Sequence, residues 1–201
     1  MNNEIPTTIS KEEIAGLELE SFPGEIVIID TLADCEKAVR YLQRQKLLGF
    51  DTETRPSFKK GKSNKVALLQ LSTQKSCFLF RLNMIGFPES LLNLLKNEKI
   101  LKVGLSLRDD FGMLRKIAPI EPAGFVDIQT YIKQFNIQEL SLQKIYALLF
   151  HKKISKSQRL SNWEAGTLNE GQKRYAATDA WACILIYNKL KKMKPQTRDT
   201  V

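Results

Sequence analysis

Carboxylates in segments that otherwise read as core are the feature that most constrains how this chain can fold. In LLGFDTE, residues 47–53, an apolar run predicts a buried strand, and Asp51 and Glu53 stand on alternate positions at its end. Alternate side chains of a strand project from the same face, so these two negative charges lie side by side next to the core. Such a pair is costly unless a positive charge lies between them.

A further carboxylate falls inside the last long helical segment, about residues 168–193. At 100° per residue, one face of this helix carries a mostly apolar stripe made of Tyr175, Asp179, Ala182, Cys183, Ile186 and Leu190. Tyr175 lies one turn before Asp179 and beside it. An unpartnered charge is unfavourable in such a stripe, so Asp179 also requires a partner.

The segment KVGLSLRDDF, residues 102–111, offers two more candidates. A strand over 100–106 is followed by a helix whose stripe includes Leu107, Phe111 and Leu114. Asp110 lies next to this stripe, whereas Asp109 is rotated a further 100° towards solvent. We therefore expect Asp110 to point inwards and Asp109 to lie on the surface.

Each of these features alone has an ordinary structural explanation. An Asp-x-Glu pair on a strand usually has no function, acidic pairs at a helix start interact with the helix dipole, and an Asp among apolar helix residues most often pairs with a buried Arg. Together, however, four inward carboxylates on three elements need a common counter-charge. One or two divalent cations supply it, and hard oxygen ligands suit Mg²⁺ or Mn²⁺.

The remaining segments predict one α/β domain with a mixed sheet flanked by helices. Its 43% of hydrophobic residues are enough for a substantial core. Strands are expected at 25–30, 47–53, 66–73, 76–82 and 100–106, with the third and fourth forming a hairpin. Helices are expected after Thr31, at 90–97, from Leu107, and at 128–136, 141–150 and 168–193. Residues 1–24 are interpreted as an N-terminal arm and 194–201 as a frayed tail.

Composition narrows the choice of partner and compartment. Lys and Arg total 31 against 22 acidic residues, and the resulting charge of +9 favours polyanions, nucleic acid first, although many basic proteins bind none. Cys35, Cys77 and Cys183 are isolated and are interpreted as reduced core thiols, not as a disulfide framework or a zinc site. Neither a membrane span nor a signal peptide is recognisable, so we expect a soluble, cytoplasmic protein without a membrane partner.

The carboxylates and the tyrosine, in this order, resemble the DEDDy group of 3′–5′ exonucleases, which have a ribonuclease H-like fold. The blocks FDTETRPSF, KVALLQLST…CFLF, KVGLSLRDDF and KSQRLSNW…YAATDAWACILIY are similar to the Werner-type exonuclease and ribonuclease D branch. A sister group has a histidine at the position of Ala176 and not the tyrosine at 175. The resemblance covers roughly residues 25–192 and implies an exonuclease domain over residues 25–193.

The resemblance also implies a mechanism with two Mg²⁺ or Mn²⁺ ions. Asp51, Glu53 and Asp179 would hold the first ion, and Asp51 would bridge to the second, with Asp110 contributing directly or through water. Tyr175 would hydrogen-bond the attacking water, because an unperturbed tyrosine pKa of about 10 makes it a poor base at neutral pH. The product would be a nucleoside 5′-monophosphate released from the 3′ end of DNA or RNA.

Substrate contacts are assigned from charge and shape. Four lysines near the first motif either steer phosphates or belong to a solvated loop; they are Lys59, Lys60, Lys62 and Lys65. Lys156 and Arg159 are candidates for phosphate contacts, and Phe58 either stacks on a terminal base or packs internally. Trp163 is interpreted as structural and His151 as a surface residue.

Two other functions remain open at this point. A catalytically silent nucleic-acid-binding module could have the same fold, although it would have no reason to keep the four carboxylates and the tyrosine together. A structural network of Asp and Arg residues on an unrelated α/β domain is the other alternative. The sequence does not distinguish DNA from RNA as the substrate.

Overall fold

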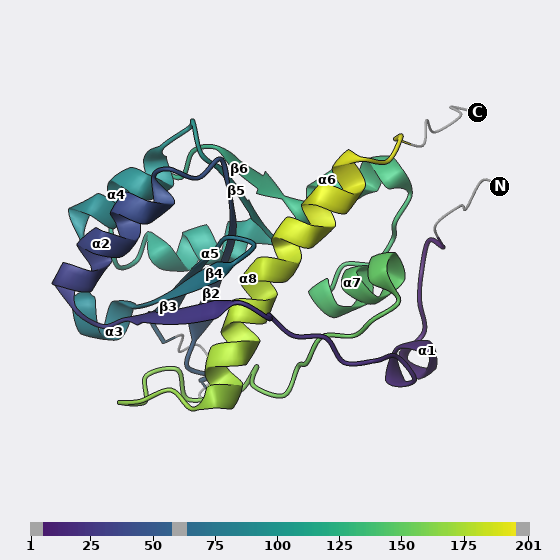
Figure 1. Cartoon of the computed structure of the whole chain (residues 1–201), viewed down its shortest axis with the longest axis horizontal. Coiled ribbons are helices and arrows are strands. Elements are labelled where there is room, and N and C mark those ends of the chain that lie inside the picture. Colours follow the sequence, from purple (N-terminus) through teal and green to yellow (C-terminus); the bar gives the residue numbers. More distant parts are fainter. Residues whose placement is uncertain (1–5, 58–63, 196–201) are drawn as a thin grey trace.

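A mixed six-stranded sheet, ordered β1-β4-β3-β2-β5-β6, forms the centre of the molecule (Figure 1). The computed structural model describes residues 6–57 and 64–195. The strands are β1 Glu25–Ile29, β2 Leu47–Thr54, β3 Val66–Ser72, β4 Ser76–Arg81, β5 Leu101–Gly104 and β6 Phe125–Asp127. Strand β3 is antiparallel to β2 and β4, and the other neighbouring pairs are parallel. The predicted hairpin and mixed sheet are therefore confirmed.

Helices cover both faces of this sheet, and each face has its own apolar cluster. One cluster lies under α2, α4 and α5, and the other lies under α8 together with α6 and α7 (Figure 1). The helices are α1 Lys11–Ala15, α2 Leu32–Leu42, α3 Leu82–Ile85, α4 Glu89–Lys96, α5 Leu107–Leu114, α6 Ile128–Tyr131, α7 Leu142–Phe150 and α8 Glu170–Lys191. A short 3-10 helix, Ile132–Phe135, continues α6, so the predicted helix over 128–136 is divided between the two.

Helix α8 is buried on nearly all sides between Tyr175 and Ile184, and not along one stripe alone. The sheet covers one side, while α7 and the chain leading into β1 cover the other (Figure 1). Phe22 packs edge-on against Trp181 with ring centroids 5.9 Å apart. The Phe22 N–H also donates to the Thr178 hydroxyl over 3.0 Å. Hydrophobic periodicity describes one helix at a time. It therefore cannot predict contacts from a segment that is distant in the sequence.

The described part of the predicted N-terminal arm packs against the rest of the chain. Ser10 and Glu13 form a capping box at the start of α1. The Ile9 N–H donates to the buried Glu139 carboxylate over 3.0 Å, and Leu19 pairs with Lys153 in an isolated bridge. The division at residue 25 nevertheless stays a prediction.

Two short elements, α3 and β6, were not expected from the sequence. β6 has three residues, too few to show an alternating pattern. Cys35, Cys77 and Cys183 are free and buried, as predicted. Within residues 6–57 and 64–195, no helix combines the length and apolar character needed to cross a membrane. The cytoplasmic location stays a prediction.

Candidate active site

Strand β2 directs Asp51 and Glu53 towards α8. In the sheet, Asp51 pairs with Gln70 and Glu53 with Leu68, and Leu68 belongs to the apolar cluster under α8. Gly49, two residues before Asp51, faces the same way. A Cβ atom at Gly49 would lie 1.9 Å from the Ala180 carbonyl oxygen, so only glycine permits β2 and α8 to approach this closely. This close approach brings α8, and with it Asp179, next to the end of β2.

The three carboxylates of Asp51, Glu53 and Asp179 converge. One oxygen from each lies within 4.8 Å of the others. Asp51 and Glu53 are half-buried, and Asp179 is only 8% exposed. In the described parts of the chain, none of the three forms a salt bridge with Lys or Arg. The structural Asp–Arg network considered above therefore has no counterpart among these residues.

Burial and mutual repulsion disfavour the charged forms of these groups. Burial, followed by the charges of Asp51 and the other acids, raises the pKa of Glu53 to about 10. Burial raises the pKa of Asp179 to about 7, although the Tyr175 hydroxyl and the charge of Lys156 act to lower it. The pKa of Asp51 is raised well above its usual range by burial and by the charges of Asp110 and Asp179. A positive charge at this point would reverse these shifts.

The donor set fits a divalent cation. It contains only carboxylate oxygens, which are the hard ligands preferred by Mg²⁺ and Mn²⁺, and it comes from two rigid elements. These carboxylates also form no salt bridge with a Lys or Arg of the described residues, which leaves their negative charge to be balanced by a cation. The residues therefore fit a divalent metal, and the donor set does not decide between Mg²⁺ and Mn²⁺.

Asp110 approaches β2 from the other face of the sheet. It accepts a hydrogen bond from the Thr52 hydroxyl, and Thr52 projects from the face opposite to Asp51 and Glu53. Burial raises the pKa of Asp110 to about 6. Asp110 is half-buried and Asp109 is exposed, as the sequence predicted. Asp110 lies near the cluster but is not one of its three mutually close carboxylates.

Asp127, which no sequence pattern singled out, fixes the start of the helix that carries Asp110. Its carboxylate accepts hydrogen bonds from the N–H groups of Ser106, Leu107 and Gln129 at 3.1, 2.9 and 2.8 Å. Ser106 has φ +58°, a left-handed conformation that is strained for a residue other than glycine. An Asp directly before the helical sequence IQTY is an N-cap signal and could have revealed part of this role.

Tyr175 lies beside Asp179 and is held against Trp163. The Tyr175 side chain is 8% exposed, Trp163 is fully buried, and their ring centroids are 6.0 Å apart. Burial and the charges of Asp179 and Glu53 raise the pKa of the Tyr175 phenol, so it stays protonated and can donate a hydrogen bond at neutral pH. The burial of Trp163 agrees with the structural role expected for it.

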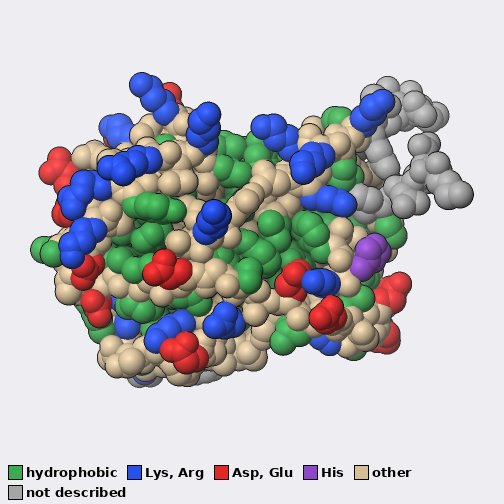
Figure 2. All heavy atoms as spheres, in the orientation of Figure 1, with side chains coloured by type: hydrophobic (Ala, Val, Ile, Leu, Met, Phe, Trp, Pro, Cys, Tyr) green, Lys and Arg blue, Asp and Glu red, His purple; other side chains and the backbone are tan. Residues whose placement is uncertain are grey.

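The segment before α8 places two cationic side chains next to the carboxylate cluster. Lys156 and Arg159 line a pocket of about 190 Å³ together with Tyr175 and Asp179. Figure 2 shows other Lys and Arg side chains along the upper edge of the molecule, above α2 and the C-terminal end of α8. Positive charge is therefore available both next to the carboxylates and farther away.

The remaining predicted substrate contacts are Phe58 and the four lysines that follow β2. Phe58, Lys59, Lys60 and Lys62 fall outside the described residues, and Lys65 is exposed. His151 is exposed at the end of α7, which agrees with the surface position expected for it.

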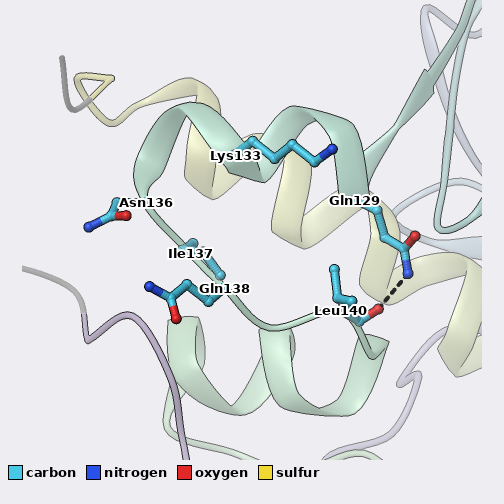
Figure 3. A pocket seen from close by; sticks show the side chains of 6 residues that line it. All are labelled: Gln129, Lys133, Asn136, Ile137, Gln138 and Leu140. Atoms are coloured by element: carbon cyan, nitrogen blue, oxygen red, sulfur yellow. Dashed lines mark hydrogen bonds between the residues drawn. The ribbon is translucent and has the colours of Figure 1, made fainter. Parts of the chain in front are cut away.

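A larger pocket of about 450 Å³ lies between the 3-10 helix and the chain leading into α7 (Figure 3). The Gln129 side-chain amide donates to the Leu140 carbonyl oxygen at its edge over 2.7 Å. Lys133 is the one charged residue in its lining, so this pocket lacks the carboxylates needed for a metal site.

Comparisons with known proteins agree with this geometry. Residues 26–194 match a family described as 3′–5′ exonuclease. The bifunctional 3′–5′ exonuclease/ATP-dependent helicase WRN of Mus musculus is 35% identical over 180 residues, which cover 84% of this chain and 13% of that protein. A putative 3′–5′ exonuclease of Acanthamoeba polyphaga mimivirus is 29% identical over 206 residues, covering 90% of this chain and 51% of that protein. The chain thus spans at most about half of the length of either relative.

Solved structures show the same fold. The Aedes aegypti Nibbler EXO domain superposes with a TM-score of 0.77 at 23% identity, covering 86% of this chain and 91% of that one. Escherichia coli RNase D superposes with a TM-score of 0.74 at 20% identity, covering 83% of this chain and 44% of that one. These neighbours confirm the ribonuclease H-like α/β fold. With the family match over residues 26–194, the chain belongs to the 3′–5′ exonuclease family and to its DEDDy-type branch.

Proposed function

We propose that this chain hydrolyses nucleic acid from the 3′ end, in a metal-dependent reaction that releases nucleoside 5′-monophosphates. The observation that carries the proposal is the convergence of Asp51, Glu53 and Asp179 within 4.8 Å, with no Lys or Arg of the described residues in a salt bridge to them. Tyr175 stands beside this cluster, and Lys156 and Arg159 line the adjoining pocket. Acidic ligands, a hydroxyl donor and phosphate-binding cations are thus available in one place.

In this proposal, Asp51, Glu53 and Asp179 would hold one divalent ion. Asp51, together with Asp110 from α5, would hold a second ion. Two bound Mg²⁺ or Mn²⁺ ions would supply Lewis-acid chemistry, because they lower the pKa of water and stabilise the oxygens of a phosphoryl displacement. Thr52 and Asp127 hold Asp110 in place, the first through its hydroxyl and the second through the start of α5.

Tyr175 orients the attacking water by donating its phenolic proton in a hydrogen bond. Its raised pKa argues against a role as general base, since the phenolate is scarce at neutral pH. Trp163 packs against the ring and restricts its movement. The Tyr175 hydroxyl therefore stays directed towards the carboxylates.

Lys156 and Arg159 contact the phosphates of the strand that enters the site. Both lie in the short segment before α8, where turn hydrogen bonds such as that from the Arg159 N–H to the Lys156 carbonyl oxygen over 3.3 Å hold the chain. The overall charge of +9 assists the encounter with a polyanion. Stacking by Phe58 and steering by Lys59, Lys60 and Lys62 remain predictions about residues outside the described ranges.

Cleavage of matched DNA and RNA oligonucleotides tests the proposal. Each is labelled at the 3′ or the 5′ end and incubated with Mg²⁺, with Mn²⁺ or with EDTA. A 3′-labelled strand should release labelled mononucleotide at once, whereas a 5′-labelled strand should shorten stepwise, and EDTA should abolish both. Asp51→Ala and Asp179→Ala should fold and be inactive. Binding without cleavage by the wild-type chain would support the silent module instead.

A further inference from the structure

Gln70 is a polar residue in the most buried part of β3. The strand reads VALLQLS, and the Gln70 side chain has 0% exposure. Both its amide oxygen and its amide nitrogen lack a hydrogen-bond partner in the described structure. A buried amide without partners lowers stability, and leucine or methionine would fill the same space without that cost. The presence of Gln70 therefore points to a hydrogen bond that is absent from the metal-free chain and forms in another state of the site.

The sheet register places Gln70 directly opposite Asp51. Side chains at opposed positions of neighbouring strands lie on the same face, with Cβ atoms about 4.5–5.5 Å apart. On the other side, in β4, Gln70 is opposite Leu79, which has no polar side-chain atom. Ser72 faces the same way as Gln70, but its hydroxyl already donates to the Thr73 carbonyl oxygen over 2.8 Å. Of the two residues directly opposite Gln70, Asp51 is thus the one whose side chain can accept a hydrogen bond, and Glu53 lies one diagonal step farther along β2.

One oxygen of the Asp51 carboxylate is available to accept a further hydrogen bond. The Oδ1 atom accepts a hydrogen bond from the Thr52 N–H over 2.9 Å, and no donor among the described residues reaches Oδ2. Carboxylates that ligate metal ions are themselves held by hydrogen bonds, and those partners fix their orientation. An amide donor one strand away is suited to this task.

We propose that Gln70 is a positioning residue for Asp51, whose carboxylate its side-chain amide holds by a hydrogen bond when the metal is bound. The inference rests on the proposed function, because it assigns Gln70 to the same metal site. Gln70 touches neither the substrate nor the reacting atoms. It acts by restricting the rotation of the carboxylate that the two ions would share.

Metal titration without substrate tests this inference. Gln70→Met keeps the length and burial of the side chain but removes the amide. It should bind Mn²⁺ about 10- to 100-fold more weakly by calorimetry, while the metal-free protein melts at the same or a higher temperature. Ser72→Ala is the matched control, because it removes a neighbouring polar group that is already satisfied, and its Mn²⁺ affinity should equal that of the wild type.

Two further results decide the role. Turnover by Gln70→Met should fall with an unchanged KM for the oligonucleotide, since phosphate contacts are intact. In an Asp51→Asn background, Gln70→Met should cause no further loss of Mn²⁺ affinity, whereas independent losses would overturn the inference. Wild-type affinity and turnover in Gln70→Met would also overturn it and leave the proposed function standing. A wild-type chain without Mn²⁺ binding or cleavage overturns both.

Discussion

The Thr52 hydroxyl donates a hydrogen bond to the Asp110 carboxylate and so joins β2 to α5 at the point where the acidic side chains gather. Asp51 and Glu53, on either side of Thr52, point to the opposite face of the sheet. This short stretch of β2 therefore contacts the helices on both faces of the sheet. Its two acids face α8, and the threonine between them contacts α5.

Replacing Thr52 by valine should release Asp110 without changing the shape of the side chain. If Asp110 serves the second ion, turnover should fall about 10- to 100-fold, as is usual for groups that orient ligands. Asp110→Asn should lose at least as much activity. Asp109→Asn is the control, because Asp109 is exposed, and it should cleave at the wild-type rate. Equal losses at Asp109 and Asp110 would contradict the assignment.

The sequence indicated that these acids converge because each one violates a pattern. Asp51, Glu53 and Asp179 occupy positions that an apolar strand or helix would give to hydrophobic residues, and the structure brings the three together. Asp110 was assigned by its angle on the helix, and it is indeed the more buried of the adjacent pair. Local periodicity is sufficient for inferences of this kind.

Residues that act through tertiary contacts were not predicted. Asp127 lies in a three-residue strand whose partner is β5, and nothing local connects it with the start of α5. Gln70 breaks the apolar pattern of β3 as clearly as Asp51 breaks that of β2, but its importance depends on a register that pairing alone reveals. Likewise, the all-round burial of α8 depends on Phe22, far away in the chain.

The metal-free protein should lose stability as the pH rises. Burial raises the folded-state pKa of Asp179 to about 7, so between the unfolded value near 4 and pH 7 the folded state binds more protons than the unfolded state. The contribution of Asp179 to the free energy of unfolding is therefore complete below pH 4. This contribution, on the order of 1–4 kcal/mol, is lost as the pH rises through 7.

Thermal melting in EDTA between pH 5 and 8 measures this loss, and saturating Mn²⁺ should reduce it. Asp179→Asn should make the metal-free profile less steep, while Glu53, whose pKa is raised to about 10, still contributes to the loss. Above this window, Lys102, whose pKa burial lowers to about 8, has the opposite effect on stability. A metal-free stability that rises from pH 5 to 8 in the wild type would contradict the prediction.

Gly49→Ala should separate β2 from α8. The new Cβ atom would meet the Ala180 carbonyl oxygen at 1.9 Å, and backbone cannot give way as a side chain can. We expect a loss of about 1–3 kcal/mol in urea unfolding and weaker Mn²⁺ binding, because Asp179 moves away from Asp51. Gly112→Ala is the control: it lies on α5 with open space around it and should stabilise the protein by about 0.5–1 kcal/mol.

Tyr175→Phe should separate metal binding from turnover. The phenylalanine keeps the packing against Trp163 but cannot donate a hydrogen bond to the attacking water. Turnover should fall by about two orders of magnitude, the lower range for positioned proton donors, with Mn²⁺ affinity unchanged. Single-turnover cleavage and calorimetry measure the two quantities. A wild-type rate in this variant would remove Tyr175 from the mechanism.

Lys156→Gln should weaken substrate binding more than turnover. Lys156 lines the pocket beside Tyr175 and Asp179, so loss of its charge removes a phosphate contact. KM should rise, and the slope of log affinity against log salt concentration should become shallower by about 0.7–0.9. Lys133→Gln removes the same charge beside the larger pocket, which shares no lining residue with the smaller one, and should leave both quantities unchanged. Equal effects of the two substitutions would mean that overall charge, and not a local contact, attracts the nucleic acid.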